Sequence, residues 1–153
     1  MPIHSSSHSR PEAVADYPVA VRLPVQWGDQ DAFGHVNNTV YLRWFETARI
    51  AYFEQSGMDP LMEQRQVGPI LASATVHYRR QVTYPDHVWI GARVARMGTK
   101  SATMEHAVYS ETEQQIAADG SCVVVAFDYG KNHSTPIPQE LRDVIAAFEQ
   151  REF

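Results

Sequence analysis

The chain has 153 residues, a length that fits one domain and leaves little room for a second. Hydrophobic residues make up 44% of the chain and charged residues 20%, which excludes an intrinsically disordered protein. The formal net charge of -5 draws the molecule neither to nucleic acid nor to an anionic membrane, so we expect no such partner.

Residues 1–17 are mostly polar and predict a flexible N-terminal tail ahead of a single domain that spans residues 18–153. The tail lacks the apolar core of a secretory signal. No stretch approaches the roughly 18 consecutive apolar residues that a membrane-spanning helix needs. The single cysteine, Cys122, lies in an apolar run, which excludes an intrachain disulfide and favours a reducing compartment. We therefore expect a cytoplasmic protein in which Cys122 is buried and not catalytic.

The first candidate strand, Val19–Trp27, alternates apolar with other residues, and Pro24 favours an edge or an irregular end. A polar segment rich in turn-forming residues follows, from residue 28 to residue 38. From Thr39 to about Gln55 the period becomes that of a helix with many aromatic residues, and Gly57 is a natural C-terminal stop. Much of the surface of this long helix should be buried.

Four further strands are predicted beyond Gly68, at residues 70–78, 87–96, 101–110 and 115–129. Their regular spacing and tight turns indicate an antiparallel meander. An apolar stripe from Leu141 to Phe148 predicts a short terminal helix, with Pro138 in its first turn. The fold class is therefore α+β: an antiparallel sheet wrapped around one long central helix, with a short C-terminal helix. Such a sheet leaves its edges and outer face exposed, so we expect a homodimer or a homotetramer.

Residues 29–38 read Asp-x-Asp-x-x-Gly-His-Val-Asn-Asn and stand directly ahead of the aromatic helix. This run resembles the signature of the 4-hydroxybenzoyl-CoA thioesterase family of hot-dog proteins, close to its bacterial acyl-CoA thioesterases. The resemblance covers about Val19 to Tyr129 and includes the order of the elements. It implies the hot-dog fold and the hydrolysis of an acyl-CoA thioester. The sequence shows neither a phosphate-binding glycine-rich loop nor metal-ligand spacing, so we expect no cofactor and no metal.

The resemblance also implies which residues act. The family's catalytic carboxylate matches Asp31, which would be either a general base that activates water or a nucleophile. The family's oxyanion donor is a backbone N–H at the start of the long helix, and it matches Asn38. Gly34 is counted among the substrate-binding residues and should permit the turn that brings Asp31 close to this helix end.

Other polar residues of this region have two interpretations each. His35 is a candidate general acid or substrate-binding residue, or else it orients the loop. Asn37 is a candidate substrate-binding residue, or else it caps the helix. Asp29 fits a structural role. Glu46 is a rival carboxylate because another hot-dog branch uses a helical glutamate, but salt bridges to the arginines on either side of it are the simpler explanation.

Coenzyme A carries phosphates, which need cations near the entrance of the site. Lys100 is a candidate because family members often carry a basic residue in the corresponding hairpin turn. Arg96 and Lys131 are further candidates, and the adjacent Arg79 and Arg80 are alternatives.

The nature of the acyl group is open in several respects. Tyr41, like other aromatic residues of the helix, either lines an acyl pocket or belongs to the core. No further charged group stands beside Asp31 in the sequence, so we predict an uncharged acyl group, aliphatic or aryl.

The alternatives to an acyl-CoA thioesterase are an acyl-carrier-protein thioesterase, a hydratase-like enzyme and a non-catalytic acyl-thioester-binding protein. The acidic loop disfavours hydration, and the N-terminal residues show no helical pattern of a DNA-binding segment.

Overall fold

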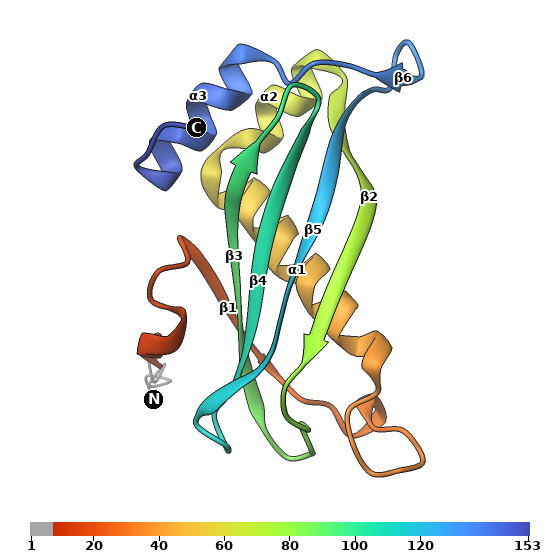
Figure 1. Ribbon diagram of the computed structural model, residues 1–153, viewed down its shortest axis with the longest axis vertical. Helices are drawn as coiled ribbons and strands as arrows, with labels where there is room; N and C mark the ends of the chain where they lie inside the picture. Colours follow the sequence, from red (N-terminus) through yellow and green to blue (C-terminus); the bar gives the residue numbers. More distant parts are fainter. Residues whose placement is uncertain (1–7) are drawn as a thin grey trace, which may run out of the picture.

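The computed structural model describes residues 8–153, and residues 1–7 of the expected tail lie outside this range. The described residues form one sheet, three α-helices and two short 3-10 helices (Figure 1). In chain order the elements are η1 (Glu12–Val14), β1 (Val19–Pro24), η2 (Trp27–Asp29), α1 (Asn38–Ser56), α2 (Met58–Arg65), β2 (Val67–Tyr78), β3 (His87–Met97), β4 (Ser101–Ser110), β5 (Gln115–Asp128), β6 (His133–Ser134) and α3 (Gln139–Glu149). Within residues 8–153 no helix is both long and apolar enough to cross a membrane.

The sheet has the strand order β1-β3-β4-β5-β2, with β6 paired to β5, and every pairing is antiparallel. The expected meander is confirmed for β3, β4 and β5. It is wrong for β2, which pairs with β5 and not with β3. Turn signals show where a chain reverses but not which strands become neighbours, because strand pairing is a long-range contact. As a result β2 forms one edge of the sheet and β1 the other.

The long helix α1 lies against one face of the sheet, which curls around it (Figure 1). The helix begins after Asn37, whose side chain accepts a hydrogen bond from the Thr39 N–H at 3.0 Å. It ends, as expected, at Gly57, which has a φ of 84°. Its aromatic residues are buried against the sheet, namely Tyr41, Trp44, Phe45, Tyr52 and Phe53. The α+β hot-dog architecture is therefore confirmed.

Helices α2 and α3 close the end of the sheet that is remote from the β1–α1 loop (Figure 1). Helix α3 is confirmed and begins directly after Pro138. Helix α2 is missing from the sequence-based prediction, because it is short and its apolar and polar residues do not separate into two faces. Pro60 fits in its first turn, where an N–H would have no intrahelical acceptor.

The segment Pro11–Tyr17 packs on the outer face of the sheet, which differs from the flexible tail expected through residue 17. Val14 in η1 is fully buried and packs with Trp89. The Tyr17 ring lies over Gly91, where a Cβ atom would come within 2.6 Å of the ring. These two apolar contacts outweigh the polar composition of the segment. Residues 11–17 therefore pack on the sheet in the structure.

A buried polar cluster lies between α1 and the sheet. The Cys122 Sγ is 3.8 Å from the Arg49 Nη1 and 3.6 Å from the His106 Nε2. Burial raises the pKa of the Cys122 thiol, in agreement with the expected buried cysteine. The His106 Nδ1 lies 3.0 Å from the Gly91 carbonyl oxygen, and its ring stacks on Phe45. Burial, with a smaller contribution from Arg49, lowers the pKa of His106 to about 4.

The protein should lose stability as the pH falls from about 6.5 to about 4, because His106 is buried in its neutral form. Its pKa is lower in the folded state than in the unfolded state, so the unfolded state takes up the proton first. The contribution of neutral His106 to the stability of the folded state is therefore complete above the ordinary histidine pKa of 6.5, and it is lost as the pH falls toward about 4. It amounts to about 3 kcal/mol in the free energy of unfolding.

Denaturant unfolding at pH 7 and pH 4 measures this loss in the wild type and in His106→Gln. The decrease should be smaller in His106→Gln by roughly 3 kcal/mol, whereas the exposed His77→Gln should behave as the wild type. Equal decreases in all three proteins would contradict the role of His106.

Candidate functional site

The loop between β1 and α1 carries the polar motif and is held by its own hydrogen bonds. The Asp29 carboxylate accepts a hydrogen bond from the Gln26 N–H at 2.8 Å, in a reciprocal capping pair at η2. The Asp29 carbonyl oxygen accepts from the Asn37 N–H at 2.9 Å, which joins the two ends of the loop. The Val36 N–H donates to the Val82 carbonyl oxygen at 2.8 Å. The loop is thereby fixed to the segment after β2, and the structural role of Asp29 is confirmed.

Asp31 stands at the turn of this loop and is half-buried. Its N–H donates to the His35 carbonyl oxygen at 2.9 Å, and its own carbonyl oxygen accepts from the Gly34 N–H at 3.1 Å. Gly34 has a φ of 82°, which confirms that a glycine permits this turn. The Asp31 Oδ1 accepts from the Phe33 N–H at 2.9 Å. Within residues 8–153 the Oδ2 has no hydrogen-bond partner, so this oxygen is available to a ligand.

The N-terminus of α1 borders the same space as Asp31. The Asn37 Oδ1 accepts from both the N–H and the hydroxyl of Thr39, at 3.0 and 2.7 Å. Of the two interpretations of Asn37, the structure thus shows the cap. The Asn38 N–H, at the first helical position, has no acceptor in the described part of the chain. Such an N–H at a helix N-terminus is available to a ligand, and the helix dipole favours negative charge there.

A hollow of about 340 Å³ joins the loop to the end of β2. Its lining residues come from the loop, from the start of α1 and from the segment after β2, and they are Asp31, His35, Val36, Asn38, Tyr41, Tyr78, Arg79, Arg80 and Gln81. The Tyr78 hydroxyl donates to the Asn38 carbonyl oxygen at 2.9 Å, which connects the strand to the helix. The Tyr41 ring meets the Tyr78 ring edge-on, with centroids 5.0 Å apart. Burial raises the pKa of Tyr41 to about 12, so this residue is a neutral wall of the hollow.

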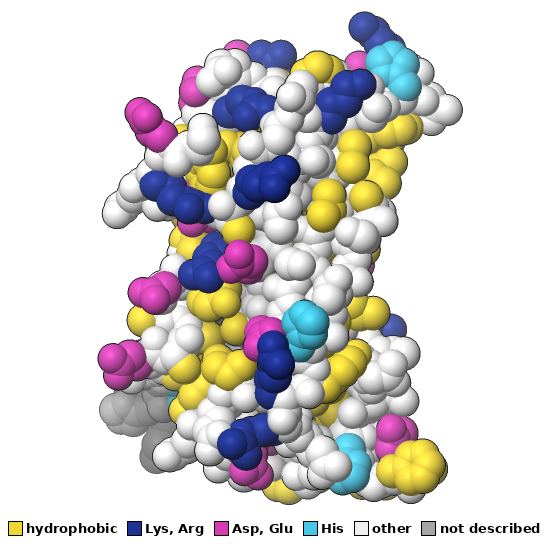
Figure 2. All heavy atoms as spheres, viewed as in Figure 1, with side chains coloured by type: hydrophobic (Ala, Val, Ile, Leu, Met, Phe, Trp, Pro, Cys, Tyr) yellow, Lys and Arg dark blue, Asp and Glu magenta, His cyan; other side chains and the backbone are white. Residues whose placement is uncertain are grey.

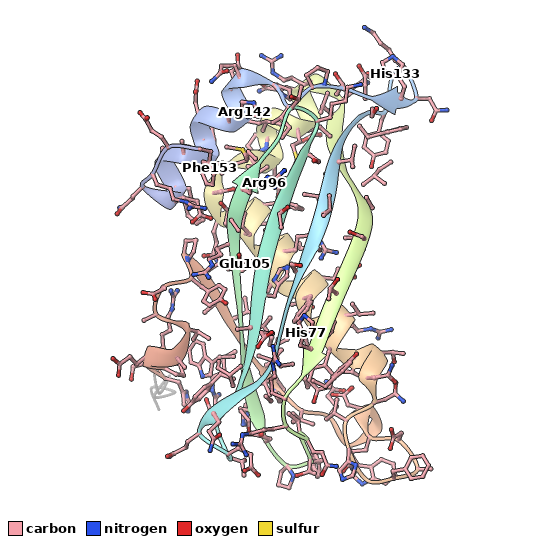
Figure 3. The ribbon with its side chains drawn as sticks, in the orientation of Figure 1. His77, Arg96, Glu105, His133, Arg142 and Phe153 are labelled. Carbon is pink, nitrogen blue, oxygen red and sulfur yellow. The ribbon has the colours of Figure 1, made fainter. Side chains whose placement is uncertain are left out.

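The basic residues expected for coenzyme A lie at two ends of the molecule. Arg79 and Arg80 line the Asp31 hollow. Lys100 and Arg96 belong to the β3–β4 end of the sheet, near α3 and far from the loop (Figures 1 and 3). Figure 2 shows that lysine and arginine side chains are concentrated at this remote end, on the face that α1 does not cover. Within one chain the structure therefore does not bring Lys100 and Arg96 to Asp31.

No charged group stands beside Asp31 in the sequence, but two arginines line the same hollow in the folded chain. The Arg79 Nε lies 3.0 Å from the Asp119 Oδ2, so its charge is partly balanced. Arg80 is exposed and forms no ion pair within residues 8–153. The sequence separates these arginines from Asp31 by all of α1 and β2, and only the folded chain brings them together.

Glu46 does not form the salt bridges expected from its neighbours on α1. Arg49 points into the core, where it is 9% exposed and contacts Cys122. No ion pair of the described chain includes Glu46 or Arg43. Helical spacing permits such pairs, but burial of Arg49 removes one of the two partners. Glu46 is exposed and does not line the Asp31 hollow, so the rival carboxylate is not at the site.

His35 is half-buried and lines the hollow, and its ring forms no hydrogen bond in the described range. Sequence reasoning missed Tyr78 and Gln81, which also line the hollow. No local pattern marks them, because their place depends on where β2 ends relative to α1. Among residues 8–153 no three His, Cys, Asp or Glu side chains gather in a way that could hold a metal ion.

A family model described as the thioesterase-like superfamily matches residues 25–145, most of the chain. The chain belongs to this superfamily. The long-chain acyl-CoA thioesterase FadM of Escherichia coli (strain K12) is 26% identical over 113 residues, which cover 74% of this chain and 86% of FadM.

Solved structures place the fold in the same superfamily. A thioesterase from Thermus thermophilus, complexed with coenzyme A and Zn, is 36% identical, with a TM-score of 0.78 over 90% of this chain and 98% of that chain. The PA2801 protein from Pseudomonas aeruginosa is 35% identical, with a TM-score of 0.74 over 85% of this chain and 99% of that chain. The resemblance drawn from the motif is therefore confirmed, and acyl-CoA thioesterase activity is supported at the level of the superfamily.

Proposed function

We propose that the protein hydrolyses an acyl-CoA thioester, with Asp31 as the catalytic carboxylate and the Asn38 N–H as the oxyanion donor. One observation carries this proposal: Asp31 and Asn38 line the same hollow, and within residues 8–153 one Asp31 carboxylate oxygen and the Asn38 N–H have no hydrogen-bond partner. Acyl transfer needs both a base or nucleophile and a preorganised donor for the oxyanion. The superfamily and the name of FadM agree with this chemistry.

Asp31 can act in one of two ways. As a general base it takes a proton from water, and the resulting hydroxide attacks the thioester carbonyl carbon. As a nucleophile it attacks that carbon itself, and water then cleaves the anhydride. In both cases negative charge develops on the carbonyl oxygen, where the Asn38 N–H and the α1 dipole stabilise it. The C–S bond breaks and coenzyme A leaves as its thiolate, so water is the only co-reactant.

Arg79 and Arg80 are the groups that we assign to the phosphates of coenzyme A. Both line the Asp31 hollow, and Arg80 has no competing ion pair in the described chain. A guanidinium group binds phosphate oxygens through two parallel hydrogen bonds. The coenzyme A bound to the Thermus thermophilus relative supports coenzyme A, and not an acyl carrier protein, as the carrier of the acyl group.

A homodimer formed through β2 is part of the proposal. The strand is an edge of the sheet, and Ile70, Leu71 and Tyr78 are 38, 48 and 48% exposed. An exposed edge strand offers unpaired N–H and C=O groups to a second strand. On the site loop, Trp27 and Phe33 are also exposed, at 74 and 84%. Association would cover these apolar surfaces, whereas a homotetramer and a cytoplasmic location stay predictions.

Neutral acyl-CoAs should be better substrates than dicarboxylyl-CoAs. The two arginines of the hollow are assigned to phosphate, so a second carboxylate on the acyl group would be buried without a partner. We expect kcat/KM for succinyl-CoA to lie at least ~10-fold below that for butanoyl-CoA. The free energy that corresponds to this ratio is a modest fraction of the cost of burying an unpaired charge. Free-thiol release from a panel of acyl-CoAs measures both values.

The same panel tests the proposed function. Thiol release that scales with the enzyme concentration supports it, and no release from any acyl-CoA refutes it. A higher kcat/KM for succinyl-CoA than for every neutral acyl-CoA would refute the substrate class and reassign Arg80 to the acyl group.

A further inference from the structure

The Asn38 N–H has no acceptor within the described residues, but the backbone groups around it are engaged. On one side, the Asn37 N–H donates to the Asp29 carbonyl oxygen at 2.9 Å, and the Asn37 carbonyl oxygen accepts from the Val40 N–H at 3.0 Å. On the other side, the Thr39 N–H donates to the Asn37 Oδ1 at 3.0 Å. These bonds hold the peptide that carries the Asn38 N–H in one direction, as a preorganised donor requires.

A further bond reaches this helix start from a distant strand. The hydroxyl of Tyr78, the last residue of β2, donates to the Asn38 carbonyl oxygen at 2.9 Å. The bonds described above are made within the loop and the first turn of α1, and the ends of helices fray. Local bonds alone therefore leave the first turn able to tilt against the sheet. The Tyr78 hydroxyl opposes this tilt, because it ties the first helical residue to the end of β2.

Tyr78 is itself held on two sides. Its ring meets the ring of buried Tyr41 edge-on, with centroids 5.0 Å apart. Directly after it, the N–H groups of Arg79 and Arg80 both donate to the Ala117 carbonyl oxygen, at 2.8 and 3.0 Å. Two donors on one carbonyl oxygen fix the end of the strand to β5. The hydroxyl is thus presented to the helix from a rigid element, which a positioning group needs.

We infer that Tyr78 is a positioning residue for the reaction, whose hydroxyl holds the first turn of α1 so that the Asn38 N–H points at the carbonyl oxygen of the thioester. This inference rests on the proposed function, in which that N–H stabilises the oxyanion. The hydroxyl acts through the backbone of Asn38 and contacts no reacting atom. Its contribution should therefore appear in the transition state, where negative charge develops, and hardly in substrate binding.

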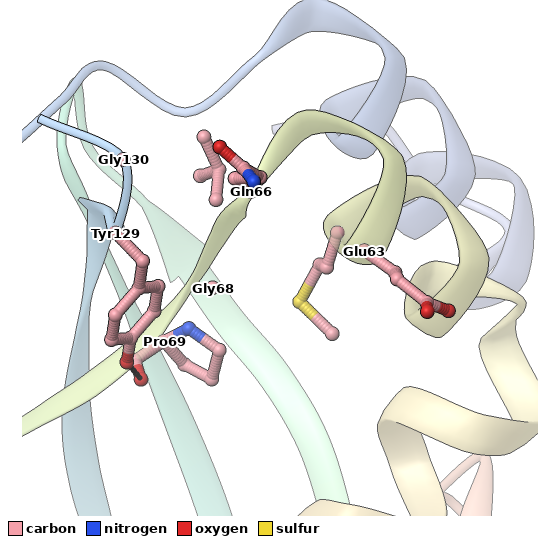
Figure 4. A pocket seen from close by; sticks show the side chains of 8 residues that line it. Glu63, Gln66, Gly68, Pro69, Tyr129 and Gly130 are labelled. Atoms are coloured by element: carbon pink, nitrogen blue, oxygen red, sulfur yellow. Dashed lines mark hydrogen bonds between the residues drawn. The ribbon is translucent and has the colours of Figure 1, made fainter.

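A second tyrosine contacts the other end of β2 in the same way (Figure 4). The Tyr129 hydroxyl donates to the Pro69 carbonyl oxygen at 3.0 Å, and both tyrosines are exposed, Tyr129 at 56% and Tyr78 at 48%. Tyr129 lines a hollow of about 370 Å³ that has no lining residue in common with the Asp31 hollow. Tyr129→Phe is therefore the matched control, because it removes the same group from the same kind of bond away from Asp31.

Tyr78→Phe keeps the ring beside Tyr41 and removes only the hydroxyl. We expect kcat for the best acyl-CoA to fall about 10-fold, part of the cost of misplacing a group by about 1 Å. KM should change less than about two-fold, because the lost interaction belongs to the transition state. Tyr129→Phe should keep the wild-type kcat and KM. Free-thiol release measures all of these values, and a wild-type kcat in Tyr78→Phe or an equal loss in Tyr129→Phe would overturn the inference.

Two coenzyme A derivatives separate positioning from a general loss of structure. Trifluoroacetonyl-CoA carries a ketone that adds water, and the hydrate becomes an oxyanion when it loses a proton, whereas S-propyl-CoA has the same chain length and no carbonyl. In Tyr78→Phe the inhibition constant of the ketone should rise about 10-fold, as kcat/KM falls, and that of S-propyl-CoA should stay within about two-fold. If both constants rise equally, Tyr78 shapes the hollow or contacts coenzyme A directly, and the inference is wrong.

Amide hydrogen exchange provides a readout that does not depend on hydrolysis. In Tyr78→Phe the N–H groups of Thr39 and Val40 should exchange about five-fold faster, the scale of one lost hydrogen bond, and in Tyr129→Phe they should exchange as in the wild type. If the wild type hydrolyses no acyl-CoA, the proposed function fails, and this comparison alone decides whether Tyr78 holds the turn. Faster exchange confined to Tyr78→Phe retains that role, and unchanged exchange removes it.

Discussion

Replacement of Asp31 by asparagine should lower kcat/KM for the best acyl-CoA at least ~100-fold, the lower range for a positioned acid–base group. An asparagine Oδ1 can still accept the Phe33 N–H that the Asp31 Oδ1 accepts, so the loop should keep its conformation. The Asn38 N–H also remains in place at the start of α1. What disappears is the group that takes a proton from water or attacks the thioester. Thiol release measures the rate, and denaturant unfolding checks that the variant remains folded.

Glu46→Gln is the matched control, because it makes the same carboxylate-to-amide change at an exposed position outside the hollow. We expect this variant to retain nearly all of the wild-type kcat/KM. Wild-type turnover by folded Asp31→Asn would rule out the mechanism proposed above. If the loss appeared in Glu46→Gln instead, the catalytic carboxylate would have to be placed on α1.

Features determined by neighbouring residues could be predicted from the sequence. Gly57 ends α1 with a φ of 84°, and Gly34 forms the turn with a φ of 82°, conformations that glycine adopts without strain. Asn37 caps α1 through its own side chain, as its place before the helical period indicated. Gly34 and Asn37 belong to a motif that lies within one loop, so its resemblance to a known family could be identified without knowledge of the tertiary structure.

Features determined by distant contacts could not be predicted. Arg80 and Tyr78 reach the Asp31 hollow because β2 ends beside the start of α1, and no local pattern shows this. Arg49 was expected to pair with Glu46, but its side chain is buried against Cys122 on a strand far along the chain. Val14 was assigned to a tail because its neighbours are polar, although it is buried against aromatic residues of the sheet. In each case a tertiary contact, and not the local signal, decided where the side chain lies.

Blocking the β2 edge should dissociate the protein and abolish most of its activity. Leu71 and Ser73 are exposed near the middle of β2, so a two-fold axis through this edge brings each of them close to the second copy. The double substitution Leu71→Lys and Ser73→Lys places like charges face to face and should prevent pairing. Light scattering should then show a mass near the 17.3 kDa of one chain, whereas the wild type should show at least twice that mass. Since Tyr78 of this edge strand lines the Asp31 hollow, loss of the second copy should leave that hollow incomplete, and kcat/KM for the best acyl-CoA should fall about 100-fold, the scale of misplacing a substrate.

Gln115→Lys at the start of β5 provides the control, because it adds the same charge at an exposed position away from the β2 edge. We expect it to remain associated and active. Circular dichroism of the double variant should retain the wild-type signal, since neither side chain belongs to the core cluster. A folded monomer that hydrolyses long-chain acyl-CoA at the wild-type rate would show that one chain encloses the whole site. It would exclude the need for a dimer through β2, while leaving the assignment of Asp31 intact.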